Sequence, residues 1–342
     1  MRPGAYLVPG INRGNKGLPV IRGEIISFLG KGWTRMQELI DGALETDVEL
    51  LGKVNRSLLS RSGKQLRPML CLLSAGLCGG VNESSCCYAA ASEMLHNATL
   101  MHDDVVDGSS LRRGAPTLSA VLGPSAAVLI GDFWLSKAVK LIVGVPDNRK
   151  VIRMFTKTLM DLSEGEMLQL QKSSDASTTE EDYLKIIYCK TASLFESACI
   201  SGAVSSGASD ERVEAVRSYA VALGCAFQIK DDILDYVGDE GLGKPLGADL
   251  REGKITLPLL GAFRNLPERE AELRETVKSI PAHPECCSDM VSTVLSAGGV
   301  AYAAARLDEF VAKAVHALEI FEDSPQKEYL AGIARYNAFR TV

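Results

Sequence analysis

Apolar side chains recur at intervals of three and four residues through most of this 342-residue chain, and this spacing is typical of α-helices. Gly, Pro, Asn and Ser collect between the segments with this pattern, where helices are expected to end. No alternation of apolar and polar residues is long enough to build a β-sheet. We therefore predict helices over residues 24–45, 84–107, 125–143, 148–171, 180–204, 211–237 and 303–321.

The predicted helices indicate an all-α fold of about a dozen helices, several of them apolar on nearly every side and therefore central. No low-complexity linker divides the chain, so we predict that residues 21–342 form a single domain. The C-terminal third, from about residue 265, shows ordinary solvated helical faces, and we assign no chemistry to it.

Residues 1–20 lack the helical pattern and are predicted to form a mobile N-terminal arm. They contain no continuous apolar stretch of the kind that a secretory signal needs. An organelle-targeting segment is the alternative, because the first acidic residue is Glu24. The segment is short, rich in Gly and free of Ser, and these properties favour the arm.

The composition narrows the classes of partner and compartment. A formal net charge of −6 and a pI near 5.4 argue against a nucleic-acid-binding protein, which normally has a basic surface. No apolar run approaches the ~20 residues that span a bilayer, so no transmembrane segment is predicted. The nine cysteines are odd in number and form no CxxC pair, which suits reduced thiols in a cytoplasmic protein.

Two acidic clusters have the pattern Asp-Asp-x-x-Asp, and each ends an apolar helix: Asp103, Asp104 and Asp107 form the first, and Asp231, Asp232 and Asp235 form the second. The first and last aspartates of a cluster are four positions apart, so they share one helical face at ~5–6 Å. Two carboxylates this close repel each other and destabilise a bare helix. A Mg²⁺ ion between them makes the arrangement favourable, because it takes oxygen ligands from one or two carboxylates and from substrate phosphates. Two such faces across a cavity are predicted to hold a small cluster of Mg²⁺ ions.

The acidic clusters allow two other interpretations. A single cluster could be an exposed acidic turn, but two copies in the same helix-end context argue against that. The pair His102–Asp103 could belong to a metal-dependent phosphohydrolase, but that chemistry needs further histidines upstream. Only His96 precedes it, on the same helix and too near.

Basic residues lie near both acidic clusters and predict a substrate with phosphate oxygens. Arginine offers phosphate a planar fork of donors and lysine a point charge, although each basic residue taken singly could be an ordinary surface charge. His96 lies two helical turns before Asp103 and hence on the same face, with a core histidine as the alternative. The residues expected at this site are Lys64, Arg67, Arg112, Arg113, Lys190, Thr191, Lys244 and Lys254.

With these motifs the chain resembles the trans-type polyprenyl diphosphate synthases of the isoprenoid synthase superfamily. The resemblance extends over about residues 60–260. It rests on "GKQLRP", "LMHDDVVDGSSLRRGAPT", "IGDFWLSKA", "KTASLF", "FQIKDDILDY" and "GKPLGADLREGKITLP", which occur in the family order. It implies an all-α helical bundle around a deep central cavity, generally in a homodimer.

The resemblance also implies an activity: a Mg²⁺-dependent prenyltransferase that joins isopentenyl diphosphate to an allylic diphosphate through a carbocation and releases diphosphate. About three Mg²⁺ ions are expected once substrate is bound. The implied ligands are Asp103, Asp107 and Asp231, with Asp104, Asp232 and Asp235 in support. The implied contacts of the allylic diphosphate are Arg112, Lys190, Thr191, Gln228, Lys244 and Lys254. The implied isopentenyl diphosphate site consists of Lys64, Arg67, His96 and Arg113.

One motif departs from the family pattern, because Ser62-Gly63-Lys64-Gln65 stands where many members have Gly-Gly-Lys-Arg. We interpret this as tolerated variation, since Lys64 and Arg67 remain. Ala98 and Thr99, one turn before Asp103, are small where members with short products tend to have an aromatic ring.

Small residues at these two positions predict a product of medium or long chain, as in synthases of octaprenyl diphosphate. Phe133 or Trp134 on the following helix could form a deeper floor, although an aromatic residue on a buried helix is more often plain core.

Three alternatives stay open. A short-chain synthase of farnesyl or geranylgeranyl diphosphate would share all these motifs. A terpene cyclase usually lacks the GKxxRP element and a second cluster of this form, so Lys64, Arg67 and Asp235 argue against it. A non-catalytic subunit of a heteromeric synthase would be expected to have degraded aspartate clusters, and both are intact here.

Overall fold

A computed structural model of the chain describes residues 18–60, 63–112, 114–238 and 246–339. It confirms the all-α prediction, since helices and one two-stranded antiparallel pair are the regular elements among the described residues. The elements are α1 (Leu18–Ala43), α2 (Glu49–Ser60), α3 (Leu66–Cys78), α4 (Glu83–Val106), β1 (Leu111–Arg112), β2 (Ala115–Pro116), α5 (Leu118–Leu122), α6 (Pro124–Val143), α7 (Arg149–Asp175), α8 (Glu180–Ile187), η1 (Tyr188–Ala192), α9 (Ser193–Ser205), α10 (Asp210–Val237), α11 (Ala248–Arg251), α12 (Leu257–Asn265), η3 (Pro267–Arg269), α13 (Glu270–Ser279), η4 (Pro284–Cys286), α14 (Cys287–Ser296), α15 (Gly299–Ala317) and α16 (Pro325–Phe339).

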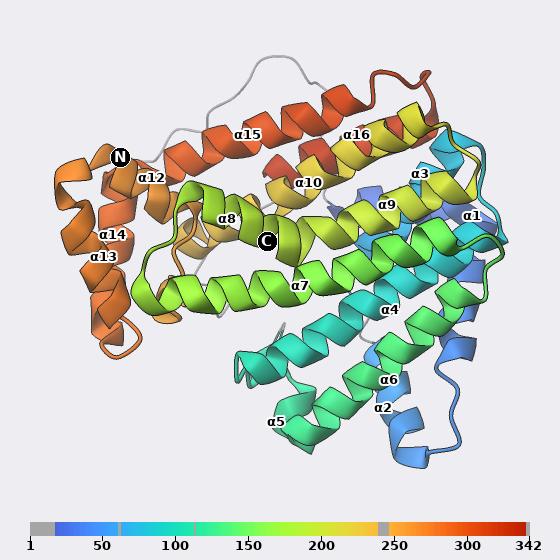
Figure 1. Cartoon of the computed structure of the whole chain (residues 1–342), viewed down its shortest axis with the longest axis horizontal. Coiled ribbons are helices and arrows are strands. Elements are labelled where there is room, and N and C mark those ends of the chain that lie inside the picture. The colour runs from blue at the N-terminus through green and yellow to red at the C-terminus, as the bar shows by residue number, and fades with distance from the viewer. Residues whose placement is uncertain (1–17, 61–62, 113, 239–245, 340–342) are drawn as a thin grey trace.

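The long helix α10 occupies the centre of the bundle and packs against α9 on one side and α15 on the other (Figure 1). One apolar core lies among α1, α3, α4, α6 and α9, and a second lies among the C-terminal half of α10 and α12 to α15. α12, α13 and α14 gather at one end of the molecule, away from α5 and α6. This arrangement places the C-terminal halves of α4 and α10, which carry the acidic clusters, beside the same space.

Helix caps fix where the functional helices begin. Asn82 caps α4 by accepting a hydrogen bond from the Ser85 backbone N–H at 2.9 Å, and the Ser85 side chain accepts one from the Asn82 backbone at 2.8 Å. Thr179 and Asp182 form the same reciprocal capping box at the start of α8. Such caps satisfy backbone donors that a helix leaves unpaired. They thereby set the starting register of the helices that lead to the site.

The predicted helix over 180–204 is interrupted. Residues Tyr188–Ala192 form a π-helical turn between α8 and α9, so the three elements make one continuous helical segment with a wider turn inside it. Periodicity alone did not reveal this turn, because an apolar pattern of threes and fours continues through it. Sequence reasoning also left out α3, whose nearly all-apolar surface is buried against α9 and α4.

Three further predictions concern the N-terminal arm, the membrane and the cysteines. Residues 1–17 of the predicted arm lie outside the described residues, and α1 begins at Leu18, so the last three positions assigned to the arm are helical. In the described part of the chain, no single helix has the length and apolar composition of a membrane span. The segments Pro284–Ser296 and Gly299–Ala317 reach that composition only together, across a 62° bend. All nine cysteines are free thiols.

Candidate active site

A cavity of about 740 Å³ lies between α4, α7, α8, α9 and α10. Both acidic clusters contribute to its wall. Those of the predicted residues that line it are Lys64, Arg67, His96, Thr99, Asp103, Asp107, Arg112, Lys190, Thr191, Gln228, Asp231, Asp232 and Lys254. The fold therefore brings most of the predicted site together from five separate stretches of sequence.

The first acidic cluster ends α4, and its three aspartates have different surroundings. Asp103 and Asp107 line the cavity, whereas Asp104 is buried and accepts a hydrogen bond from Arg112 Nε at 2.7 Å. Burial raises the pKa of Asp103 to about 6. The positive charge of Lys190 lowers this pKa, and the negative charge of Glu166 raises it. A cation placed beside this buried carboxyl group would stabilise its ionised form.

The second cluster lies near the end of α10. Asp231 and Asp232 line the cavity. Asp232 is buried and accepts hydrogen bonds from the hydroxyl of Tyr183 at 2.6 Å and from Gln228 Nε2 at 2.9 Å. Burial and the nearby charge of Asp249 hold the pKa of Asp232 well above its usual range. Asp231 is only half-buried and is therefore the more accessible of these two carboxylates at the cavity.

Asp235 does not line the cavity but organises the segment that follows. Its carboxylate oxygens accept hydrogen bonds from the backbone N–H groups of Ala248 at 2.9 Å and Asp249 at 3.1 Å. Asp249 and Lys254, which follow in that segment, do line the cavity. The Asp235 carboxylate thus holds the backbone that presents these two residues, while its supporting role in metal binding stays a prediction.

Asp249 was missed by sequence reasoning, although it stands inside the quoted motif "GKPLGADLREGKITLP". Burial, with the neighbouring charge of Asp235, raises the pKa of Asp249 to about 6. Its position between an acidic cluster and Lys254 was the available signal. Tyr183 and Glu166 were missed as well, and nothing in their local sequence marks them.

Lys190 and Thr191 lie in the π-helical turn. Lys190 Nζ contacts Glu166 Oε2 at 2.5 Å and Gln169 Oε1 at 3.0 Å, both on α7. Thr191 donates from its hydroxyl to Gln228 Oε1 at 2.9 Å, and Gln228 in turn donates to Asp232. A continuous line of hydrogen bonds therefore links the turn to the second acidic cluster.

Lys64, Arg67 and His96 line the cavity. Lys64 lies in the short segment before α3, Arg67 lies at the start of α3, and His96 lies on α4. The guanidinium carbon of Arg67 lies 4.8 Å from the centre of the Phe195 ring. Arg22 on α1 fixes the segment by donating to the Lys64 carbonyl oxygen at 3.0 Å. These contacts position Arg67 and the backbone of Lys64 at the wall of the cavity, where two cationic side chains suit an anionic group.

Gln65, the departure from the family pattern, adopts a left-handed backbone conformation with φ of 51°. Its side-chain oxygen accepts hydrogen bonds from Arg22 and from Gln37, each at 3.3 Å. The side chain is therefore engaged by α1, a contact that the sequence did not indicate.

The remaining predicted residues divide into three groups. Arg113 and Lys244 lie outside the described residues. Of the two chain-length positions, Thr99 lines the cavity, whereas Ala98 is 1% exposed and lies in the core. Neither Phe133 nor Trp134 lines the cavity; Trp134 is buried and donates to Asn55 at 2.9 Å.

The chemistry of the donors fits a hard divalent cation. The carboxylates of Asp103, Asp107 and Asp231 place oxygen atoms at the cavity wall. Within the described ranges, no three acidic, imidazole or thiol side chains are close enough to enclose a metal by themselves. A cation here would therefore complete its coordination with phosphate oxygens and water, which is how Mg²⁺ is usually held.

Comparison with known families agrees with this geometry. The family model described as "Polyprenyl synthetase" matches residues 48–294, which span both acidic clusters and the cavity between them. The chain belongs to the polyprenyl synthetase family. The matched region includes all the predicted site residues.

Curated family members are similar over nearly the whole chain. An all-trans-nonaprenyl-diphosphate synthase (geranyl-diphosphate specific) of Rhodobacter capsulatus is 38% identical over 315 residues, covering 91% of this chain and 96% of that protein. The octaprenyl diphosphate synthase of Escherichia coli strain K12 is 37% identical over 292 residues, covering 85% and 90%. A crystal structure of a polyprenyl synthase from Caulobacter crescentus CB15, complexed with calcium and isoprenyl diphosphate, superposes with a TM-score of 0.86 at 35% identity, covering 94% of this chain and 98% of that one.

Proposed function

We propose that this protein is a trans-prenyltransferase that elongates an allylic diphosphate with isopentenyl diphosphate and releases diphosphate. The observation that carries the proposal is that Asp103, Asp107 and Asp231 line one cavity together with Lys190 and Arg112. Facing carboxylates combined with cations suit a substrate that is itself a complex of metal and diphosphate. Membership of the polyprenyl synthetase family supports the same activity.

The side chains at the wall act first on the allylic substrate. Lys190, Arg112 and Lys254 bind its diphosphate group, and their charge stabilises the negative charge that grows as the carbon–oxygen bond breaks. Asp103, Asp107 and Asp231 would hold Mg²⁺, which when bound supplies Lewis-acid stabilisation of the leaving diphosphate. The bonding electron pair leaves with the diphosphate, and the allylic carbon becomes cationic.

The second substrate is held at the other basic group. Lys64, Arg67 and His96 bind isopentenyl diphosphate, so that its double bond lies against the cationic carbon and attacks it. The new carbon–carbon bond forms, and the proton lost from isopentenyl diphosphate passes to the released diphosphate. Apolar residues of the wall, among them Leu194 and Phe195, keep water from quenching the cation.

The product is proposed to be of medium or long chain. Thr99 gives the cavity wall beside the first acidic cluster a small side chain, and the curated relatives reported above make eight- and nine-unit products. A short-chain product remains the alternative, and the length distribution from the assay below decides between them.

A homodimer is proposed through α5 and α6. Val121, Val128, Leu129, Val139 and Val143 are exposed there, and exposed apolar side chains that gather on one face favour association. Light scattering coupled to size-exclusion chromatography should give a mass twice that of the chain. Leu129→Lys should yield monomers, whereas Leu295→Lys on α14, also exposed, should leave the mass unchanged.

The proposed activity is tested by incubating the purified chain alone with isopentenyl diphosphate, Mg²⁺ and allylic primers of several lengths, then sizing the dephosphorylated products. Linear polyprenols and released diphosphate are expected, and activity should disappear with a chelator and return with added Mg²⁺. Cyclic hydrocarbons without consumption of isopentenyl diphosphate would instead identify a cyclase. Activity only after addition of a second protein would identify a subunit of a heteromeric synthase.

A further inference from the structure

The π-helical turn Tyr188–Ala192 is held from three sides by residues outside the cavity. We propose that Gly165, Gly224 and Glu196 are positioning residues that keep this turn in place, so that Lys190 and Thr191 face the cavity. The proposal rests on the proposed function, because it concerns the binding of the allylic diphosphate. The residues act through Lys190 and Thr191 and do not touch substrate.

A π-helical turn contains one residue more than an α-helical turn and is therefore wider, and such turns frequently mark functional sites. Both neighbouring helices have a glycine where they meet it. A Cβ atom on Gly165 of α7 would lie 2.6 Å from Cβ of Cys189 and 3.0 Å from Cγ of Lys190. A Cβ atom on Gly224 of α10 would lie 2.5 Å from Cα of Ala192. Neither side of the widened turn has room for a methyl group.

Close approach is the reason for glycine at these two positions. Gly165 and Gly224 lie well inside long helices, where glycine weakens a helix relative to alanine, and neither has a positive φ angle. By contrast, a Cβ atom on Gly332 in α16 would meet nothing within 4 Å. Gly332 therefore provides a matched helical control.

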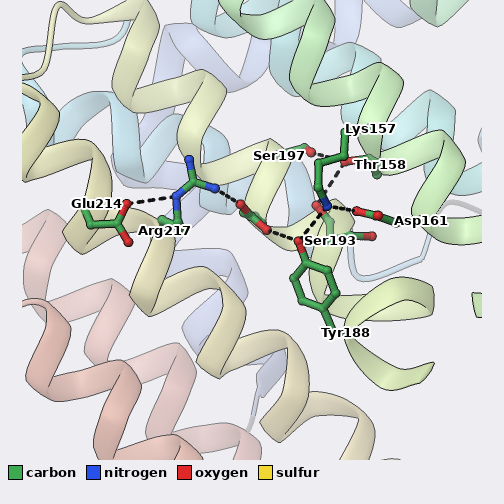
Figure 2. A network of polar contacts seen from close by, with 9 residues as sticks. Lys157, Thr158, Asp161, Tyr188, Ser193, Ser197, Glu214 and Arg217 are labelled. Atoms are coloured by element: carbon green, nitrogen blue, oxygen red, sulfur yellow. Dashed lines mark hydrogen bonds and ion pairs between the residues drawn. The ribbon is translucent and has the colours of Figure 1, made fainter. Parts of the chain in front are cut away.

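The side of the turn away from the cavity is anchored by a polar network (Figure 2). The hydroxyl of Tyr188 donates to Glu196 Oε2 at 2.9 Å, and Glu196 is buried and paired with Arg217 of α10. Lys157 of α7 donates to the Tyr188 hydroxyl oxygen at 3.2 Å and to Asp161. The network thus ties the turn to α7, α9 and α10 at once, and Glu196 is its buried centre.

A displacement of the turn would reach the site directly. A side chain added at position 165 would press on the stem of Lys190 itself, whose Nζ atom contacts Glu166 and Gln169. Thr191 would lose its alignment with Gln228, and with it the hydrogen-bonded line to Asp232. The allylic diphosphate should therefore be affected more than isopentenyl diphosphate, whose predicted contacts Lys64, Arg67 and His96 lie before α3, at the start of α3 and on α4.

The test compares Gly165→Ala with Gly332→Ala in the full-length protein. Gly165→Ala should raise the KM for the allylic diphosphate about tenfold, while the KM for isopentenyl diphosphate changes less than twofold. It should also raise the Kd for inorganic diphosphate with Mg²⁺, measured by calorimetry, about tenfold. Gly332→Ala should change none of these. Adding Cys189→Gly to Gly165→Ala removes the closer of the two clashing atoms and should restore diphosphate binding.

Glu196→Gln provides a second variant if Gly165→Ala does not fold. It keeps an oxygen for the Tyr188 hydroxyl but loses the charge paired with Arg217, and it should weaken diphosphate binding with Mg²⁺ at least threefold. Unchanged diphosphate binding in folded Gly165→Ala or Glu196→Gln protein overturns the inference, as does equal loss of both substrates. A wild-type protein that binds diphosphate but makes no polyprenol refutes the proposed function instead, and the binding comparison still stands.

Discussion

Arg112 Nε donates a hydrogen bond of 2.7 Å to Asp104 Oδ1, so the middle aspartate of the first acidic cluster anchors an arginine that lines the cavity. Asp104 is buried and the side chain of Arg112 is 36% exposed. The cluster therefore has two parts: Asp103 and Asp107 face the cavity, and Asp104 holds a cation at its edge. The dense grouping of like charges in the sequence is thus divided between two tasks in space.

This anchoring predicts a difference between two substitutions of Asp104. Asp104→Asn keeps a side-chain oxygen for Arg112, whereas Asp104→Ala leaves the guanidinium without its buried partner. A hydrogen bond to a charged group is worth about 1.5–3 kcal/mol, so Asp104→Ala should raise the KM for the allylic diphosphate about tenfold or more. Steady-state kinetics with both variants provide the measurement. Equal KM values for Asn and Ala would show that the bond does not position Arg112.

Tyr183 is predicted to stabilise the second cluster. Its hydroxyl lies 2.6 Å from Asp232, and burial together with that carboxylate holds the pKa of Tyr183 well above its usual range, so the hydroxyl remains a donor. Tyr183→Phe removes a donor from a buried carboxyl group and should lower the free energy of unfolding by about 1–3 kcal/mol. Urea denaturation measures this. Tyr329→Phe, on a partly exposed tyrosine of α16, serves as the control and should change stability little.

Asp103 is predicted to lower the stability of the metal-free protein above pH 6. Its folded pKa is about 6, above the ordinary value of 3.8, so the folded state holds this proton more tightly than the unfolded state. Its contribution to stability is therefore neutral below about pH 4 and becomes unfavourable as the pH rises from 4 to 6.

In a chelator, Asp103→Asn should then be more stable than wild type by on the order of 1–3 kcal/mol at pH 7, and nearly equal to it at pH 4. The same variant should lose nearly all activity. Thermal unfolding at the two pH values tests this, with the exposed Asp47→Asn as control. A stability gain that is the same at both pH values would contradict the assignment.

The product length should respond to Thr99 and not to Ala98. Thr99 lines the cavity, so Thr99→Phe should place a ring in the path of the growing chain and shorten the product, as sizing of the polyprenols would reveal. Ala98 is in the core, and Ala98→Phe should instead destabilise the fold by about 1–3 kcal/mol through overpacking. An unchanged length distribution in Thr99→Phe would mean that the chain does not pass this residue.

The sequence by itself determined the fold class and the chemistry of the site. Helical spacing of apolar residues fixes which segments are helices, and the aspartates four apart fix which carboxylates share a face, because both are local consequences of helix geometry. Arg112 could be identified for the same reason, since it follows the first acidic motif closely, whereas Lys64, Arg67 and Lys190 lie far from both motifs in the sequence.

Only the tertiary structure decided how the members of each motif divide their work. Asp104 and Asp107 are three positions apart, yet one binds Arg112 and the other faces the cavity. Ala98 and Thr99 are neighbours, yet only Thr99 lines the cavity. Adjacent residues on a helix point about 100° apart, and what each one meets depends on helices from distant parts of the chain. The π-helical turn depends in the same way on glycines of α7 and α10, and no local pattern could reveal it.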